Sequence, residues 1–155
     1  LAMCAFYERF MARDLAALDV DTAVAAWPSW DAIETDIRTR LDGSLAEHCV
    51  KETRTKYLDA DGLRRRLTAL IESWDEVRAK LQSQLKPARE LQTMLRQAGA
   101  PHVPDDIGLT AQQVQQTFLS AAYYRSRYSV LDLAREAGWF EELVEEVFAP
   151  GGLWT

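Results

Sequence analysis

The fold class of this chain is decided by its longest regular stretch, DGLRRRLTALIESWDEVRAKLQSQL (residues 61–85). Its apolar side chains recur at intervals of three and four residues: Leu63, Leu67, Leu70, Ile71, Trp74, Val77, Leu81 and Leu85. Side chains at these intervals share one face of an α-helix, and the positions between them are mostly charged or polar. The stretch therefore predicts a long amphipathic helix with one buried face.

The same reading, extended outward in both directions, predicts helices throughout the chain. They are expected at about residues 1–18, 21–26, 30–41, 44–57, 87–98, 110–127, 129–137 and 139–148. Their predicted starts include Ser29, Ser44, Thr110 and Ser129, which are residue types that cap helix N-termini. No segment alternates apolar and polar residues over the length of a strand. We expect one all-α domain over residues 1–155, an irregular orthogonal bundle of about eight helices.

Composition narrows the class of protein. The chain has 155 residues and a net charge of −6, from 24 acidic and 18 basic side chains. Because phosphate backbones and anionic lipid surfaces repel an acidic chain, we expect neither nucleic-acid nor membrane binding. Cys4 and Cys49 are isolated in the sequence, which favours free thiols and a cytoplasmic location.

The first residues are apolar and have no capping side chain before them. Leu1, Ala2, Cys4, Ala5 and Phe6 begin a helical pattern at once. A first turn without a cap leaves its backbone N–H groups without partners. We therefore expect that this helix continues upstream, and that the chain is part of a longer polypeptide.

Motifs for known chemistry are few. The sequence has no G-x-G-x-x-G or P-loop segment and no G-x-S-x-G elbow, so we assign no catalytic or cofactor-binding residue. His48 and Glu52 lie one helical turn apart, beside Glu47, and could supply ligands to a metal-binding helical bundle. A third ligand is not evident nearby, and we assign no metal ligand.

The most unusual string is YYRSRYSVLDL (residues 123–133). Ser129 and Asp132 have the spacing of a capping box, so the string predicts a corner between two helices. Arg125 and Arg127 would lie near a helix C-terminus, where the helix dipole favours cations. We take Arg125, Arg127 and Tyr128 as candidates for contact with a phosphate or with a cleft.

Four segments together resemble one enzyme family, the sn-glycerol-1-phosphate dehydrogenases. RSRYSVLDLAREAGWFEELVEEVF (residues 125–148) resembles the family's C-terminal helices, which carry an R-x-R-Y-[ST]-[VI]-L-[DS]-L string. The segments AGAPHVPDDIGLT (98–110), AAWPSWDAIETDIR (25–38) and TRTKYLDADGLRRRL (53–67) are also similar to it. Trp139 and Phe140 depart from the pattern, because the family has smaller aliphatic residues there.

The resemblance implies a fold and an activity for the parent polypeptide. The family belongs to the iron-containing alcohol dehydrogenase and dehydroquinate synthase superfamily, which joins a Rossmann-like domain to a helical domain. A divalent metal (Zn, Ni or Fe) held by one Asp and two His polarises the substrate carbonyl, and NAD(P)H delivers hydride to dihydroxyacetone phosphate. Those ligands would precede Leu1, and the segment alone would be inactive. This chain would be the distal part of that larger two-domain polypeptide; it would pack against its own Rossmann-like domain and support a homodimer.

A rival hypothesis comes from a different class of protein. The chain could be a free-standing helical interaction module without enzymatic activity. The natural sequence upstream of Leu1 would separate the two hypotheses, since only the dehydrogenase needs a His-Gly stretch there.

Overall fold

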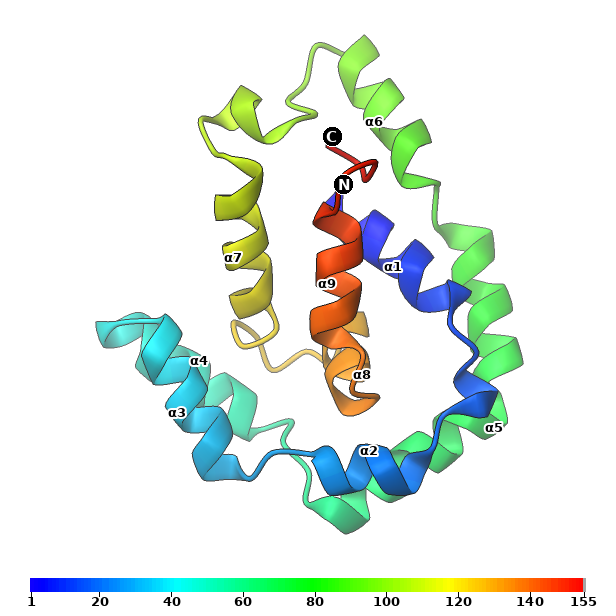
Figure 1. The fold of residues 1–155 in the computed structure, drawn as a ribbon, viewed down its shortest axis with the longest axis vertical. Helices are drawn as coiled ribbons and strands as arrows, with labels where there is room; N and C mark the ends of the chain where they lie inside the picture. The colour runs from blue at the N-terminus through cyan, green and yellow to red at the C-terminus, as the bar shows by residue number, and fades with distance from the viewer. Residues whose placement is uncertain (155) are drawn as a thin grey trace.

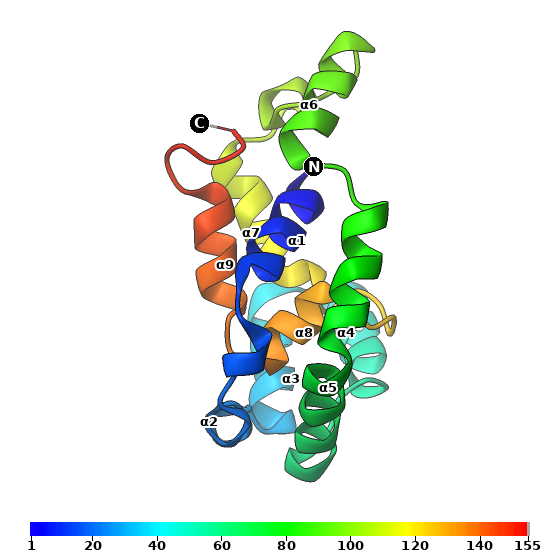
Figure 2. The ribbon, with the colours of Figure 1, turned by 90° about the vertical axis from the view of Figure 1, so that its right-hand side faces the viewer.

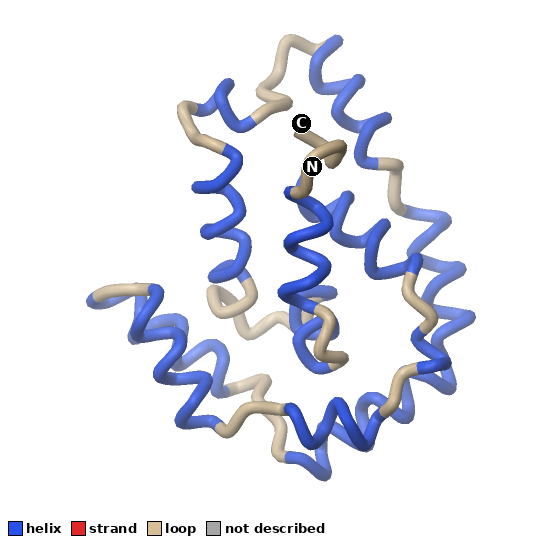
Figure 3. The backbone as a smooth tube through the Cα atoms, in the orientation of Figure 1, coloured by secondary structure: helices blue, strands red, loops and turns tan. Residues whose placement is uncertain are grey.

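Helices and short loops make up the whole of the chain that the computed structural model describes, residues 1–154 (Figures 1 and 3). The α-helices are α1 (Ala2–Ala12), α2 (Val20–Ala26), α3 (Trp30–Arg40), α4 (Gly43–Arg54), α5 (Ala60–Gln84), α6 (Ala88–Gln97), α7 (Ala111–Ala121), α8 (Val130–Glu136) and α9 (Phe140–Phe148). Two 3-10 turns, η1 (Leu15–Ala17) and η2 (Pro104–Ile107), lie between them. No strand occurs within those 154 residues, which confirms the all-α prediction.

The main core forms around α9, which lies between α1 and α7 in Figure 1 and packs on α8. Aromatic side chains fill its centre. Phe6 is fully buried, with its ring centroid 5.4 Å from that of Phe118 and 5.9 Å from that of Phe140. The long helix α5 runs along the outside and buries Leu63 and Leu67 against α2 and η1. The apolar face predicted from residues 61–85 is thus the face that meets the core.

Helices α3 and α4 form a hairpin with a small core of its own. Its buried members are Ile33, Ile37, Cys49 and Tyr123, and Tyr123 comes from the end of α7. In Figure 1 this hairpin projects at the lower left, away from most of α5, and Figure 2 shows it behind α5. The molecule therefore has two hydrophobic cores that meet near the α7–α8 connection.

Helix boundaries differ from the sequence expectation in three places. The first predicted helix breaks at Arg13, because the Asp14 carboxylate accepts the backbone N–H of Ala16 and starts a 3-10 turn instead. Helix α4 begins at Gly43 rather than at a Ser44 cap. Helix α7 ends at Ala121, not near residue 127, for a reason that lies in α4 and is described below.

No helix within residues 1–154 is both long enough and apolar enough to cross a membrane.

Candidate functional site

The connection between α7 and α8, residues 122–129, is held mainly by side chains from α4 and the turn after it. We refer to it as the α7–α8 corner. Three of its carbonyl oxygens accept hydrogen bonds from distant side chains: Ala122 from Lys56 Nζ (2.5 Å), Tyr123 from Thr53 Oγ1 (3.2 Å) and Tyr124 from His48 Nε2 (3.1 Å). Carbonyls at a helix C-terminus lack partners within the helix. These donors supply them, so α7 ends where α4 meets it.

A carboxylate of α4 also fixes the corner. The Glu52 side chain accepts the backbone N–H of Ser126 at 2.9 Å. Hydrogen bonding from the Ser126 side chain, and from this backbone N–H, holds the pKa of Glu52 below its ordinary value, because it favours the charged form. His48 and Glu52 are therefore both committed to backbone groups of the corner.

Helix α8 begins with the capping box that its sequence predicts. The Ser129 hydroxyl accepts the N–H of Leu131, and Asp132 Oδ2 accepts the N–H of Ser129 at 2.8 Å. The other oxygen of Asp132 pairs with Lys56 Nζ at 2.5 Å, and both side chains are only 10% exposed. One carboxylate thus closes a helix cap and neutralises a nearly buried lysine.

A second buried carboxylate lies one turn further along α8. Glu136 is 3% exposed; it accepts from Arg66 Nη1 at 2.6 Å and from the Tyr128 hydroxyl at 2.7 Å. The Arg66 guanidinium also lies 4.6 Å from the centroid of the Tyr128 ring. Burial raises the pKa of Glu136 above its ordinary value, and the contacts with Tyr128 and Arg66 offset part of that rise.

Tyr123 links the two cores through its hydroxyl group. It donates to Asp36 of α3 at 2.6 Å and accepts from Arg135 of α8. The Arg135 guanidinium lies 4.2 Å from the centroid of the Tyr123 ring. Burial raises the pKa of Tyr123 to about 12, although the neighbouring Arg135 charge acts in the opposite direction.

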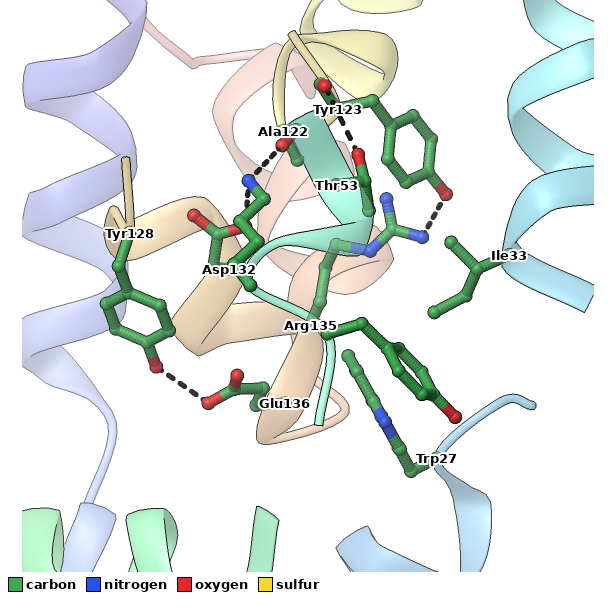
Figure 4. A pocket seen from close by; sticks show the side chains of 11 residues that line it. Trp27, Ile33, Thr53, Ala122, Tyr123, Tyr128, Asp132, Arg135 and Glu136 are labelled. Atoms are coloured by element: carbon green, nitrogen blue, oxygen red, sulfur yellow. Dashed lines mark hydrogen bonds and ion pairs between the residues drawn. The ribbon is translucent and has the colours of Figure 1, made fainter. Parts of the chain in front are cut away.

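Figure 4 shows how these side chains close around a small cavity. Dashed contacts join Tyr128 to Glu136, Tyr123 to Arg135 and Asp132 to the lysine beside it, so the polar groups point at one another. The space enclosed is about 30 Å³, enough for roughly two water molecules. Ligand sites are about ten times larger. We therefore interpret this side of the corner as a structural network.

The opposite side of the corner borders an open groove of about 410 Å³. Arg125 and Arg127 both line it, together with Leu41 after α3 and residues of α4 and α7. Tyr128 instead lines the small cavity of about 30 Å³. The three candidates from the sequence are thus divided between two places, and only the arginines face a space of ligand size.

The three residues considered for a metal-binding bundle do not converge. Glu47 forms an ion pair with Arg38, while His48 and Glu52 hold the corner. In the part of the chain that the structure describes, no group of three His, Cys, Asp or Glu side chains could hold a metal ion.

The sequence predicts the local contacts of this corner but not the long-range ones. The Ser129–Asp132 cap has a local spacing that predicts it. Lys56 and Thr53 reach the corner, and Arg66 reaches Glu136, across 66 to 70 residues of sequence, and no local pattern indicates such contacts. Comparison of the chain with protein-family models, curated proteins and solved structures gave no significant match.

Proposed function

We propose that this chain is the helical part of a metal-dependent, NAD(P)-linked dehydrogenase of the glycerol-1-phosphate type. The observation that supports the proposal most directly is the string at residues 125–133, which resembles the family's R-x-R-Y-[ST]-[VI]-L-[DS]-L pattern. Its polar positions Ser129 and Asp132 form the α8 cap, and its apolar positions Val130, Leu131 and Leu133 are buried in the main core.

The packing of the string connects it to a second of the resembling segments. A Ser-to-Asp spacing of three residues occurs often, but here the same Asp also neutralises Lys56 inside the protein. The lysine belongs to TRTKYLDADGLRRRL (residues 53–67), a second segment in which the sequence resembles that family. Two of the resembling segments are therefore joined by a nearly buried ion pair, which supports reading them together.

In this proposal, cofactor binding and structural support belong to two different domains of one polypeptide. A Rossmann-like domain would bind NAD(P)H, and a divalent metal held outside this chain would supply Lewis-acid polarisation of the carbonyl of dihydroxyacetone phosphate. The residues of this chain would hold the helical domain in shape, and we expect the parent to be a cytoplasmic homodimer. No proton or hydride transfer is assigned to them.

The test is an activity assay on the full-length polypeptide that carries this chain. The protein is stripped of metal, reloaded separately with Zn²⁺, Ni²⁺ or Fe²⁺, and mixed with dihydroxyacetone phosphate and NADH or NADPH. We expect oxidation of the reduced nucleotide with at least one metal, and much less with unphosphorylated dihydroxyacetone. A folded protein that is inactive under every combination would overturn the proposal.

A second candidate function is a helical binding module without chemistry. The groove of about 410 Å³ beside Arg125 and Arg127 favours it, because such a surface can bind a ligand without any catalytic group. A polypeptide that binds a ligand there and shows no dehydrogenase activity would support this candidate.

A further inference from the structure

The groove lies between the α3–α4 hairpin and the last turn of α7. One wall carries Leu41, Leu45 and Cys49, and the other carries Ala121 and Tyr124. Cys49 is almost completely buried, whereas Leu45 and Tyr124 are 43% and 49% exposed at the edge. These two are among the five large apolar side chains that are exposed within residues 1–154. Two of the five therefore border this groove.

Positive charge lies at the same edge. Arg125 and Arg127 are exposed and line the groove, and across the described part of the chain neither forms an ion pair with a carboxylate. The Arg125 guanidinium lies 5.8 Å from the centroid of the Tyr124 ring. Although the chain has a net charge of −6, these two arginines place positive charge directly beside an apolar surface. The pair is complementary to an anion.

The size of the groove agrees with a small molecule. Its volume of about 410 Å³ falls within the range of ligand sites in proteins, which begins near 300 Å³. Its polar side chains, Thr117, Ser120 and Ser129, are few beside its apolar ones. A sugar or polyol would leave most of its hydroxyl groups without partners on such a lining. An apolar chain has no hydroxyl groups to satisfy and suits this lining.

We propose that the groove binds an anionic amphiphile, a single acyl or alkyl chain that ends in a phosphate or carboxylate. The acyl or alkyl chain of this ligand lies along Leu41, Leu45 and Tyr124, and Arg125 and Arg127 bind its head group. Guanidinium groups form paired hydrogen bonds with either kind of anion. This site goes beyond the proposed function, because the dehydrogenase reaction uses no ligand with an apolar chain.

Calorimetric titration of the purified chain tests the proposal with four probes. Dodecyl phosphate and dodecanoate, kept below their micelle concentrations, are expected to bind at one site and more weakly as salt is raised. Dodecanol has the chain without the charge, and inorganic phosphate has the charge without the chain. Both are expected to bind at least tenfold more weakly than dodecyl phosphate.

Two variants locate the site. The double variant Arg125→Gln/Arg127→Gln is expected to weaken dodecyl phosphate at least tenfold while leaving dodecanol unchanged. Ala121→Trp, at an exposed position of α7 that lines the groove, is expected to abolish binding of every chain-bearing probe. Arg65→Gln is the matched control, because Arg65 is an exposed arginine of α5 that does not line the groove. It is expected to change nothing.

Each contrary outcome overturns the proposal. Inorganic phosphate that binds as tightly as dodecyl phosphate would indicate a phosphate subsite without a chain site. Co-sedimentation with anionic vesicles, without binding of the free amphiphile, would indicate a lipid surface. Self-association that is lost in Ala121→Trp, with no amphiphile bound, would indicate a second copy of the chain. None of these results depends on dehydrogenase activity.

Discussion

At the scale of single residues, the most consequential contact is the ion pair between Lys56 and Asp132. Both side chains are 10% exposed, so each has lost most of its hydration. Lys56 also donates to the Ala122 carbonyl, and Asp132 also accepts from Ser129. A buried pair repays its desolvation only when such additional hydrogen bonds satisfy the remaining donors and acceptors. Here they do, and removal of one partner leaves a charge without compensation.

Lys56→Met tests this account. The substitution keeps a long apolar side chain but leaves the Asp132 carboxylate buried and unpaired, so we expect a loss of about 3 kcal/mol in the free energy of unfolding. Urea denaturation monitored by circular dichroism measures it. The control is Lys86→Met, since Lys86 pairs with Glu90 on the surface and both side chains are more than half exposed. Equal effects of the two substitutions would contradict the account.

The hydroxyl group of Tyr123 makes stability depend on alkaline pH. Its pKa is about 12 in the folded protein and about 10 in the unfolded chain. Below pH 10 both states hold the proton, and the contribution is fully present. Between pH 10 and 12 the unfolded chain loses the proton first, so stability falls as pH rises, by about 2 kcal/mol near the upper end.

Tyr123→Phe should flatten part of that decline. The variant lacks the phenol, so we expect it to be less stable at pH 8 but to lose less stability between pH 10 and 11. Burial also raises the pKa values of Tyr7 and Tyr128, so these two tyrosines account for the rest of the decline in stability. Urea unfolding at each pH gives the comparison, with Tyr124→Phe on the exposed side of the corner as control. An unchanged slope in Tyr123→Phe would rule out this role.

At the scale of elements, the sequence predicts a helix or a helix start correctly where residues close in the sequence determine it. The period of residues 61–85 predicts α5, and Thr110 and Ser129 cap α7 and α8 as their residue types indicate, Ser129 with the predicted spacing to Asp132. Each of these signals lies within a few residues of the structure that it specifies.

Element ends set by distant partners could not be predicted in this way. Helix α7 stops at Ala121 because side chains of the α4 region, some 70 residues earlier, bind the carbonyls that follow. The same limit applies to the site. Arg125 and Arg127 were identified from the sequence, but the facing wall of their groove comes from Leu41 and from α4, and no pattern at residues 41–49 indicates it.

At the scale of the whole molecule, two cores of unequal size meet at the α7–α8 corner. The main core joins α1, α5, α7, α8 and α9, whereas the second is confined to the α3–α4 hairpin and Tyr123. A small core joined to a larger one mainly through side-chain contacts is expected to open first. We therefore expect the hairpin to unfold in a partial step that leaves the main core intact.

Native-state hydrogen exchange can test this order with two substitutions. Leu143→Ala removes a fully buried side chain of the main core and should lower the exchange free energy of amides in α1, α5 and α9 by about 3 kcal/mol. Amides of α3 and α4 should be unaffected, because their opening leaves the main core folded. Tyr123→Phe should lower the exchange free energy of both groups of amides by a similar amount, about 1 kcal/mol. The reason is that global unfolding includes the opening of the hairpin. If Leu143→Ala weakens α3 and α4 as much as α9, the two cores unfold together and the hairpin is not a separate unit.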